Sequence, residues 1–246
     1  MANPKSSLSI PPLVSKRFTL IGIILLCVLL QIINSLPGVN LNGLGIYPRS
    51  LSGLTGIFFA PFLHGGWAHL LSNLIPFAVL GWLVCQYSVK RFWAVFIFTA
   101  VVGGLLVWLF GRANIHVGLS GVLYGLWGFL ICYGIMHRSF KAIAISVAVV
   151  FLYSGLIWGV LPQRPHVSFE SHLFGALAGI LIGYYLAKQD KKIVLIVGDI
   201  GYGIFDDFRK NHPDRFVNLG ICEQSLIGVA SGMALQGMKP WVYTIT

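Results

Sequence analysis

Long apolar runs alternate with short polar gaps over the first three quarters of the chain. A helix needs about 20 apolar residues to cross roughly 30 Å of hydrocarbon. Six runs approach that length, at residues 18–36, 69–88, 92–110, 119–136, 140–160 and 171–187. Each should be helical, because lipid offers backbone polar groups no hydrogen-bond partners. The pattern predicts an all-α polytopic membrane protein with a bundle of six transmembrane helices.

The pattern changes after Ala187. There, short apolar stretches that read as strands (KIVLIVGD, RFVNLG, PWVYTIT) alternate with FDDFRKNH and EQSLIGVASGMALQG, which read as helices. This βαβαβ order predicts a small, truncated α/β segment with parallel strands. We therefore expect four regions: a cytoplasmic N-terminal segment (1–17), a six-span membrane domain (18–187), a linker (188–192) and the α/β segment (193–246).

Composition and charge support this division. The chain is 57% hydrophobic and 10% charged, whereas a soluble domain carries about 25% charged residues. Residues 1–187 hold ten Lys/Arg and a single acid, Glu170, while residues 188–246 hold seven Lys/Arg and six acids. The basic residues of the first region lie in gaps between apolar runs and not on one face of a soluble fold. This placement argues against a nucleic-acid partner and for the lipid bilayer.

The distribution of Lys and Arg predicts the orientation. One set of alternate gaps holds ten of them, against three in the other set (Arg49, Arg112 and Arg164). Both termini should therefore be cytoplasmic, and the long gap 37–68 should face outside. The first run lacks a following small-residue cleavage site, so we expect it to be retained. Three of the four cysteines lie in apolar runs, so we expect neither disulfides nor a metal site.

Four polar residues stand out near the outer ends of the predicted spans: His69, Asn73, Ser120 and His172. Ionisable residues within spans often mark function. Each also has a structural explanation, because Ser120 could be a small packing residue, His172 a helix-end histidine, and His69 with Asn73 an interhelical hydrogen bond. His64, in HGGWAH, is expected to order its loop.

Glycines offer a way to bring two of these residues together. Gly175 and Gly179 recur every fourth residue behind His172, and Gly118 and Gly121 flank Ser120. Bare glycine surfaces let two helices approach closely. A serine and a histidine carried on such helices could come within hydrogen-bond reach, as a base-activated nucleophile requires.

Three motifs resemble the rhomboid intramembrane serine proteases: HGGWAHLLSN (64–73), GLSGVLYG (118–125) and SHLFGALAG (171–179). The segment YPRSLSGLTGIFFAPFLHG (47–65), which includes Arg49, is similar to the first outer loop of bacterial members. The resemblance covers roughly residues 10–188. It implies a bacterial inner-membrane protease whose active site opens to the outer face and whose substrates are transmembrane helices of other proteins.

The resemblance also implies residue roles. Ser120 matches the nucleophile and His172 the general base, while His69 and Asn73 match the groups that stabilise the oxyanion with the Ser120 N–H. Tyr124 matches the aromatic residue that packs against the base. By analogy, GRANIHVG (111–118) should dip into the bundle, the span 140–160 should act as a gate, and residues 161–170 should form an outer cap.

The end of the chain resembles a different family. GDIGYG (198–203) followed by RFVNLGICEQSLIGVASGMAL is similar to the start of the pyrimidine-binding domain of transketolase-like thiamine diphosphate enzymes. Glu223 matches the glutamate that contacts the cofactor there. Only the beginning of that domain is present, so we expect no bound cofactor.

Two other functions remain open from the sequence. The membrane domain could be a catalytically inactive rhomboid-like protein that binds client helices without cutting them. The whole chain could alternatively be a membrane-tethered subunit of a thiamine diphosphate enzyme.

Overall fold

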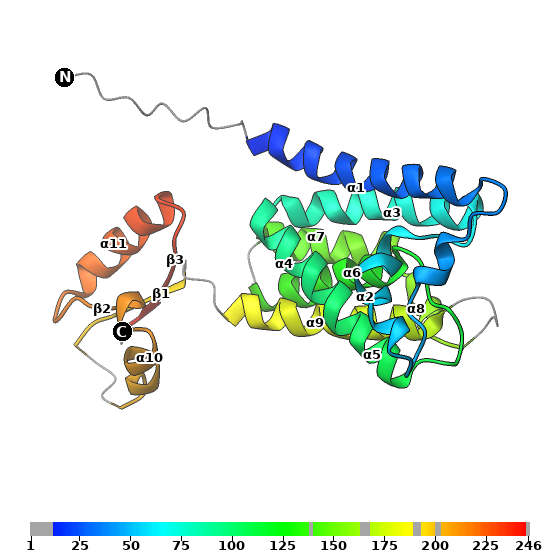
Figure 1. Ribbon diagram of the computed structural model, residues 1–246. Helices are drawn as coiled ribbons and strands as arrows, with labels where there is room; N and C mark the ends of the chain where they lie inside the picture. Colours follow the sequence, from blue (N-terminus) through cyan, green and yellow to red (C-terminus); the bar gives the residue numbers. More distant parts are fainter. Residues whose placement is uncertain (1–11, 138–139, 163–167, 189–192, 200–202, 245–246) are drawn as a thin grey trace, which may run out of the picture. The chain divides into compact units, whose positions relative to one another are not determined.

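The computed structural model describes residues 12–137, 140–162, 168–188, 193–199 and 203–244 (Figure 1). The chain forms two compact units, Met1–Ala187 and Lys188–Thr246. Residues 1–11 of the expected N-terminal segment and 189–192 of the expected linker lie outside the described residues, as do parts of the expected cap (163–167) and of GDIGYG (200–202).

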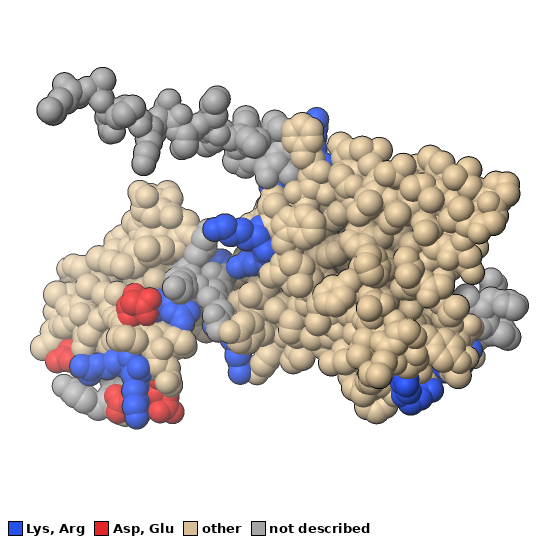
Figure 2. Space-filling model, in the orientation of Figure 1, with Lys and Arg blue, Asp and Glu red and all other residues tan. Residues whose placement is uncertain are grey.

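The first unit is built from helices, and five segments of it are long and apolar enough to cross a membrane. They are Lys16–Asn34 within α1 (Pro12–Asn34), α3 (Trp67–Cys85), Val89–Phe110, α6 (Ser120–His137) and α9 (Phe169–Lys188). They coincide with five of the six predicted runs. Figure 2 shows one face of this unit almost free of Lys, Arg, Asp and Glu, which gather near its ends. That distribution suits a protein whose sides face lipid.

The third of these segments contains an irregular turn. It consists of α4 (Val89–Phe98), η4 (Thr99–Gly103) and α5 (Gly104–Phe110), and η4 is a single π-helical turn. The Thr99 hydroxyl donates to the carbonyls of Val95 (2.7 Å) and Phe96 (3.1 Å). Short π turns of this kind occur mostly as single bulges inside α-helices, often near functional sites.

The fifth predicted run, residues 140–160, is not one helix. α7 (Phe140–Leu152) has 13 residues, which span about 20 Å and fall short of the predicted length. A turn at 153–155 then leads into the short α8 (Leu156–Gly159). The Ser154 hydroxyl donates to the Phe151 carbonyl (3.3 Å), and local bonds of this kind compete with the regular helical pattern and favour the end of the helix there.

The long gap after α1 is folded rather than open. It contains the short elements η1 (Leu41–Leu44), η2 (Ser52–Leu54), α2 (Gly56–Phe59) and η3 (Ala60–Phe62). Ile46, Ile57 and Ala60 from this segment pack with Val107 of α5 in a separate apolar cluster. Hydropathy runs alone did not predict these elements, because each is too short to show a helical period.

α6 is the most buried of the five long helices. Its side chains form one continuous core with those of α1, α3, α4 and α9, including the fully buried Phe77, Phe92, Leu126, Phe129 and Tyr133. Because lipid supplies little hydrophobic drive between helices, close packing must hold this bundle together. A central α6 therefore fixes where its first residue, Ser120, can lie.

The second unit has the predicted βαβαβ order. Its strands β1 (Ile193–Val197), β2 (Phe216–Asn218) and β3 (Lys239–Tyr243) form a parallel sheet in the order β2-β1-β3, with Leu195 opposite both Phe216 and Trp241. The connecting elements are α10 (Asp206–Asn211), η5 (Pro213–Arg215) and α11 (Glu223–Leu235). Val194 and Ile196 pack on Leu226 and Ala230 of α11 in a small core.

Candidate functional site

The sequence-predicted polar residues converge on one cavity. It has a volume of about 580 Å³ and is lined by residues of α3, α6, α9 and the segments before them: Gly65, His69, Ser72, Asn73, Arg112, Asn114, Ile115, His116, Val117, Ser120, Ser168 and His172. Ser120, His172, His69 and Asn73 are all among them. The fold thus brings together four residues that are spread over about a hundred positions of the chain.

Ser120 is the first residue of α6 and is buried. The N–H groups in the first turn of a helix lack intrahelical partners, so they are available to an anion. Gly118, two residues earlier, has φ +127°, and a Cβ there would lie 2.9 Å from the His69 imidazole. Only glycine lets this backbone turn so close to His69.

Glycine contacts between α6 and α9 place His172 on the same cavity. A Cβ on Gly175 would lie 2.0 Å from the Gly121 carbonyl oxygen, and one on Gly179 would lie 2.0 Å from that of Gly125. The two helices therefore approach backbone to backbone, as the glycine spacing predicts. Any side chain at these positions would push α9, and His172 with it, away from α6.

Two contacts hold the His172 ring. Its Nδ1 lies 2.9 Å from the Gly159 carbonyl oxygen at the end of α8, and its face stacks on Tyr124 with centroids 4.2 Å apart and planes 9° apart. Among the described residues, no hydrogen bond joins the Ser120 hydroxyl to His172. Such bonds are often long before substrate binds and tighten in the reacting complex.

His69 and Asn73 lie one turn apart on α3 and face the cavity. Nδ1 of His69 accepts a hydrogen bond from the Gly65 N–H (3.4 Å), so its Nε2 is directed toward Gly118. The side-chain nitrogen of Asn73 is buried, and no described residue accepts a hydrogen bond from it. A buried donor without a partner is costly, so it is suited to a group that arrives with the substrate.

His64 lies beneath the loop that leads into α6. It is 1% exposed, and its Nε2 accepts a hydrogen bond from the Leu119 N–H (3.3 Å). Burial, together with the nearby His69, lowers the pKa of His64 to about 4, so the ring is neutral at pH 7. His64 is therefore bound to the backbone next to Ser120.

Polar contacts at the rim connect the loop 111–119 to the start of α9. Arg112 donates from Nε to Glu170 Oε1 (2.6 Å) and from Nη2 to Oε2 (3.3 Å). The buried His116 bonds to the Ser168 hydroxyl (2.6 Å), which in turn bonds to that of Ser171 (2.7 Å). Sequence reasoning missed this network. The signal in the sequence was Glu170, because the one acid among residues 1–187 should have a basic partner.

Arg49 supports the same loop from the other side. Its guanidinium donates to the carbonyls of Leu109 (3.2 Å) and Gly111 (2.9 Å), at the end of α5. Its backbone has φ 60°, a conformation uncommon for a residue other than glycine. Arg49 therefore joins the segment between α1 and α3 to the end of α5.

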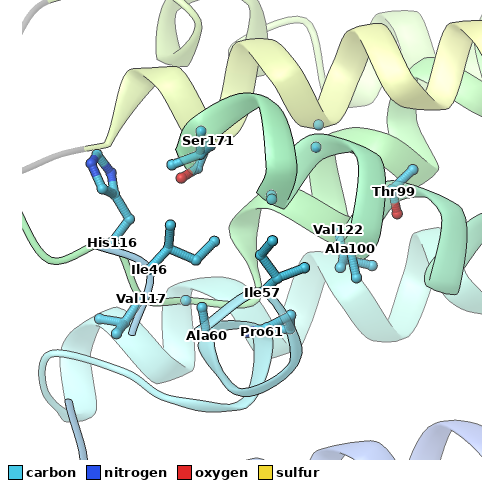
Figure 3. A pocket seen from close by; sticks show the side chains of 16 residues that line it. Ile46, Ile57, Ala60, Pro61, Thr99, Ala100, His116, Val117, Val122 and Ser171 are labelled. Carbon is cyan, nitrogen blue, oxygen red and sulfur yellow. The ribbon is translucent and has the colours of Figure 1, made fainter. Parts of the chain in front are cut away.

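A second, smaller hollow of about 40 Å³ lies next to the loop that leads into α6 (Figure 3). Apart from His116, Ser171 and Thr99, the side chains labelled in Figure 3 are apolar: Ile46, Ile57, Ala60, Pro61, Ala100, Val117 and Val122. Because His116 and Val117 line both hollows, this part of the loop separates the polar cavity from the apolar one.

In the second unit, Glu223 is exposed at the first residue of α11. Residues 184–246 match the family model described as the transketolase pyrimidine binding domain. A 1-deoxy-D-xylulose-5-phosphate synthase of Nitratidesulfovibrio vulgaris is 47% identical over 58 residues, which cover 23% of this chain and 9% of that protein. The second unit is thus similar to a fragment of a much longer protein.

The first unit has relatives along most of its length. Residues 52–189 match the family model described as the Rhomboid domain. An uncharacterized protein of Mycobacterium tuberculosis is 37% identical over 184 residues, which cover 71% of this chain and 76% of that protein. RHOMBOID-like protein 1 of Arabidopsis thaliana is 31% identical over 195 residues, which cover 77% of this chain and 42% of that protein. This chain is therefore a membrane protein of the rhomboid family.

Proposed function

We propose that the first unit is a serine endopeptidase that cleaves transmembrane helices of other membrane proteins. The observation that supports it is the convergence of Ser120, His172, His69 and Asn73 on one polar cavity in a unit whose sides are otherwise apolar. Acyl transfer by a serine enzyme uses a nucleophilic hydroxyl, an imidazole base and hydrogen-bond donors for the oxyanion. These four residues offer such groups.

The proposed reaction uses a Ser–His dyad. The Ser120 Oγ attacks the scissile carbonyl carbon while Nε2 of His172 takes the hydroxyl proton. His69, Asn73 and the Ser120 N–H stabilise the resulting oxyanion. The His172 imidazolium then gives its proton to the leaving amine as the C–N bond breaks. Water, deprotonated by the same Nε2, hydrolyses the acyl-serine ester and restores the hydroxyl.

The cavity is large enough to admit water and a segment of unwound substrate. At about 580 Å³ it lies within the range of ligand-binding pockets. A peptide bond inside a regular helix is shielded by its own hydrogen bonds. We expect substrates with small or helix-breaking residues near the cleaved bond, entering past α7 and α8.

The excess of Lys and Arg in one set of gaps supports an orientation with both ends in the cytoplasm. The cavity then opens toward the outer face of a bacterial inner membrane. In this proposal the second unit, which spans only a fragment of its relative, contributes no cofactor chemistry.

The direct test is labelling with a fluorophosphonate probe in detergent, followed by mass spectrometry of the labelled peptide. The wild-type protein should carry the probe on Ser120 and cleave at least one member of a panel of reporter transmembrane helices. Ser120→Ala and His172→Ala should each abolish both signals while the protein stays folded. Ser52→Ala, which removes a hydroxyl from the exposed outer loop, is the matched control and should keep both.

A folded wild-type protein that neither takes the probe nor cleaves any reporter would contradict the proposal. Binding of reporter helices without cleavage would then favour the client-binding function instead.

A further inference from the structure

The contact between His172 and Gly159 assigns a role to α8. We infer that the backbone carbonyl of Gly159, at the end of α8, is the group that orients the general base, in the place that a carboxylate takes in other serine hydrolases. This inference rests on the proposed protease function and extends it to the regulation of the same site.

The bond itself fixes how His172 carries its proton. A carbonyl oxygen can only accept, so at 2.9 Å from Nδ1 it requires the hydrogen to be on Nδ1. In the neutral ring Nε2 is then the acceptor, as a general base for Ser120 needs. Tyr124, whose ring centroid lies 4.2 Å from that of His172, fixes the plane of the imidazole ring. Stacking does not determine which of the two ring nitrogens carries the hydrogen.

No acidic side chain takes this role in the described part of the first unit. Glu170 is the sole acid of residues 1–187, and its carboxylate is bound to Arg112 in a bidentate pair. That leaves the Gly159 carbonyl as the polar partner that the structure gives to Nδ1 of His172.

Residue 159 must be glycine for this contact to form. A Cβ at Gly159 would lie 1.8 Å from the Tyr124 hydroxyl oxygen and 3.2 Å from Nδ1 of His172. The carbonyl can therefore reach the ring only because no side chain stands between α8 and the Tyr124–His172 stack.

The consequence is a link between the position of α8 and catalysis. Gly159 is the last residue of α8, which follows α7 after the turn 153–155. Any outward movement of α7 and α8 that admits a substrate therefore also removes the acceptor from His172. The base is correctly oriented only when α8 has returned, so the substrate helix enters first and the reaction follows.

The test compares two glycines of the same segment. Gly159→Ala should lower the rate of fluorophosphonate labelling at Ser120 at least about tenfold, because a misplaced base loses an order of magnitude or more. It should lower kcat for a reporter helix by the same factor, with KM little changed. Gly155→Ala is the matched control: it lies four residues earlier in the same segment, nothing lies within 4 Å of its Cβ position, and both rates should stay at the wild-type level.

A role of α8 as a gate alone gives a different result. Gly159→Ala would then alter cleavage of the reporter helix while labelling by the small probe stayed unchanged, which would overturn the inference. Wild-type labelling at Ser120 reports on the proposed function separately, so the two failures are distinguishable.

A measurement on the unmodified protein avoids the risk that Gly159→Ala does not fold. The ¹⁵N chemical shifts of His172 should show a protonated Nδ1 and an unprotonated Nε2 at neutral pH. The opposite tautomer would exclude a bond donated to Gly159.

Discussion

The side-chain amide of Asn73 has a buried nitrogen without a partner among the described residues, and this leads to a graded prediction. Asn73→Ala should reduce kcat by about 10²–10³, the usual effect of losing one oxyanion donor, without abolishing labelling of Ser120. Asn114→Ala is the matched control, because Asn114 lines the same cavity but its side chain bonds to the Ile115 N–H. Equal losses in both variants would contradict an oxyanion role for Asn73. Steady-state cleavage of a reporter helix measures the difference.

His64 makes the first unit sensitive to acid. Its pKa is lowered to about 4 in the folded protein, below the value of about 6.5 in an unfolded chain. Between these values the unfolded state binds more protons, so stability is complete above pH 6.5 and is lost as pH falls toward 4. The shift corresponds to about 3 kcal/mol.

The measurement is the apparent melting temperature in detergent between pH 7 and pH 4. His64→Gln should flatten the decrease that the wild-type protein shows over this range. An unchanged slope in the variant would mean that other groups cause the acid sensitivity.

The residue scale also shows what a sequence can and cannot predict about a site. Ser120, His69, Asn73 and His172 were recognisable because each lies in a short motif with its own chemistry. The Arg112–Glu170 pair joins residues 58 positions apart, and the Gly159 contact involves a backbone atom. Neither leaves a local pattern, so both required the fold.

At the scale of elements, the glycines of α9 form an internal series. Cβ atoms at Gly175 and Gly179 would each lie 2.0 Å from a carbonyl oxygen of α6, whereas the nearest atom to a Cβ at Gly183 would be 3.3 Å away. Gly179→Ala should destabilise the unit by about 1–3 kcal/mol, as overpacking usually does, and should reduce cleavage. Gly183→Ala in the same helix should change both little. Melting temperature and reporter cleavage check the series, and equal effects would argue against backbone contact.

The Arg112–Glu170 pair connects the loop before α6 to α9. Glu170 is 4% exposed, so Arg112→Ala would leave a buried carboxylate without its main partner. We expect a cost of about 2 kcal/mol, less than for a fully buried pair, because the Arg112 side chain is 42% exposed and water screens it. Arg112→Ala combined with Glu170→Gln should recover part of that loss. A double-mutant cycle on melting temperatures measures the coupling, and additive effects would show that the pair contributes nothing.

The elements that hydropathy predicted well are the long ones. Five of six predicted spans are present as long helices, because about 20 apolar residues in a row have few other options in lipid. The break at Ser154 and Gly155 was missed because the apolar run continues through it. The short helices between α1 and α3 were missed because they contain less than one heptad.

At the scale of the whole molecule, the two compact units predict independent behaviour. A chain ending at residue 188 should keep the melting temperature of the full-length protein, and its rate of reporter cleavage should stay within about twofold. The reason is that the main core and the polar cavity both lie in the first unit, and changes at distant sites without shared partners have independent effects. Loss of cleavage in a folded truncated protein would show that the second unit participates. Comparison of the two chains in the same detergent tests this.

The division into two units was itself predictable, because charge and periodicity change together near Ala187. A membrane helix and a buried strand are both apolar, but they differ in length, and six of the seven acids of the chain lie in the second unit. Apart from the glycine contact of α6 with α9, the contacts that organise the first unit could not be predicted, because they depend on which faces of the helices meet.

The π turn Thr99–Gly103 takes up one extra residue in the third span. Each residue of an α-helix advances the direction of its side chains by about 100°, whereas each residue of a π turn advances it by less. Deleting one residue from this turn would therefore leave a regular helix, with Val107 still facing Ile46 and Ile57. A one-residue deletion within α5, beyond the turn, would instead rotate the end of that helix by about 100°. The carbonyls that receive Arg49 would then face elsewhere, and the loop that leads to Ser120 would lose this support.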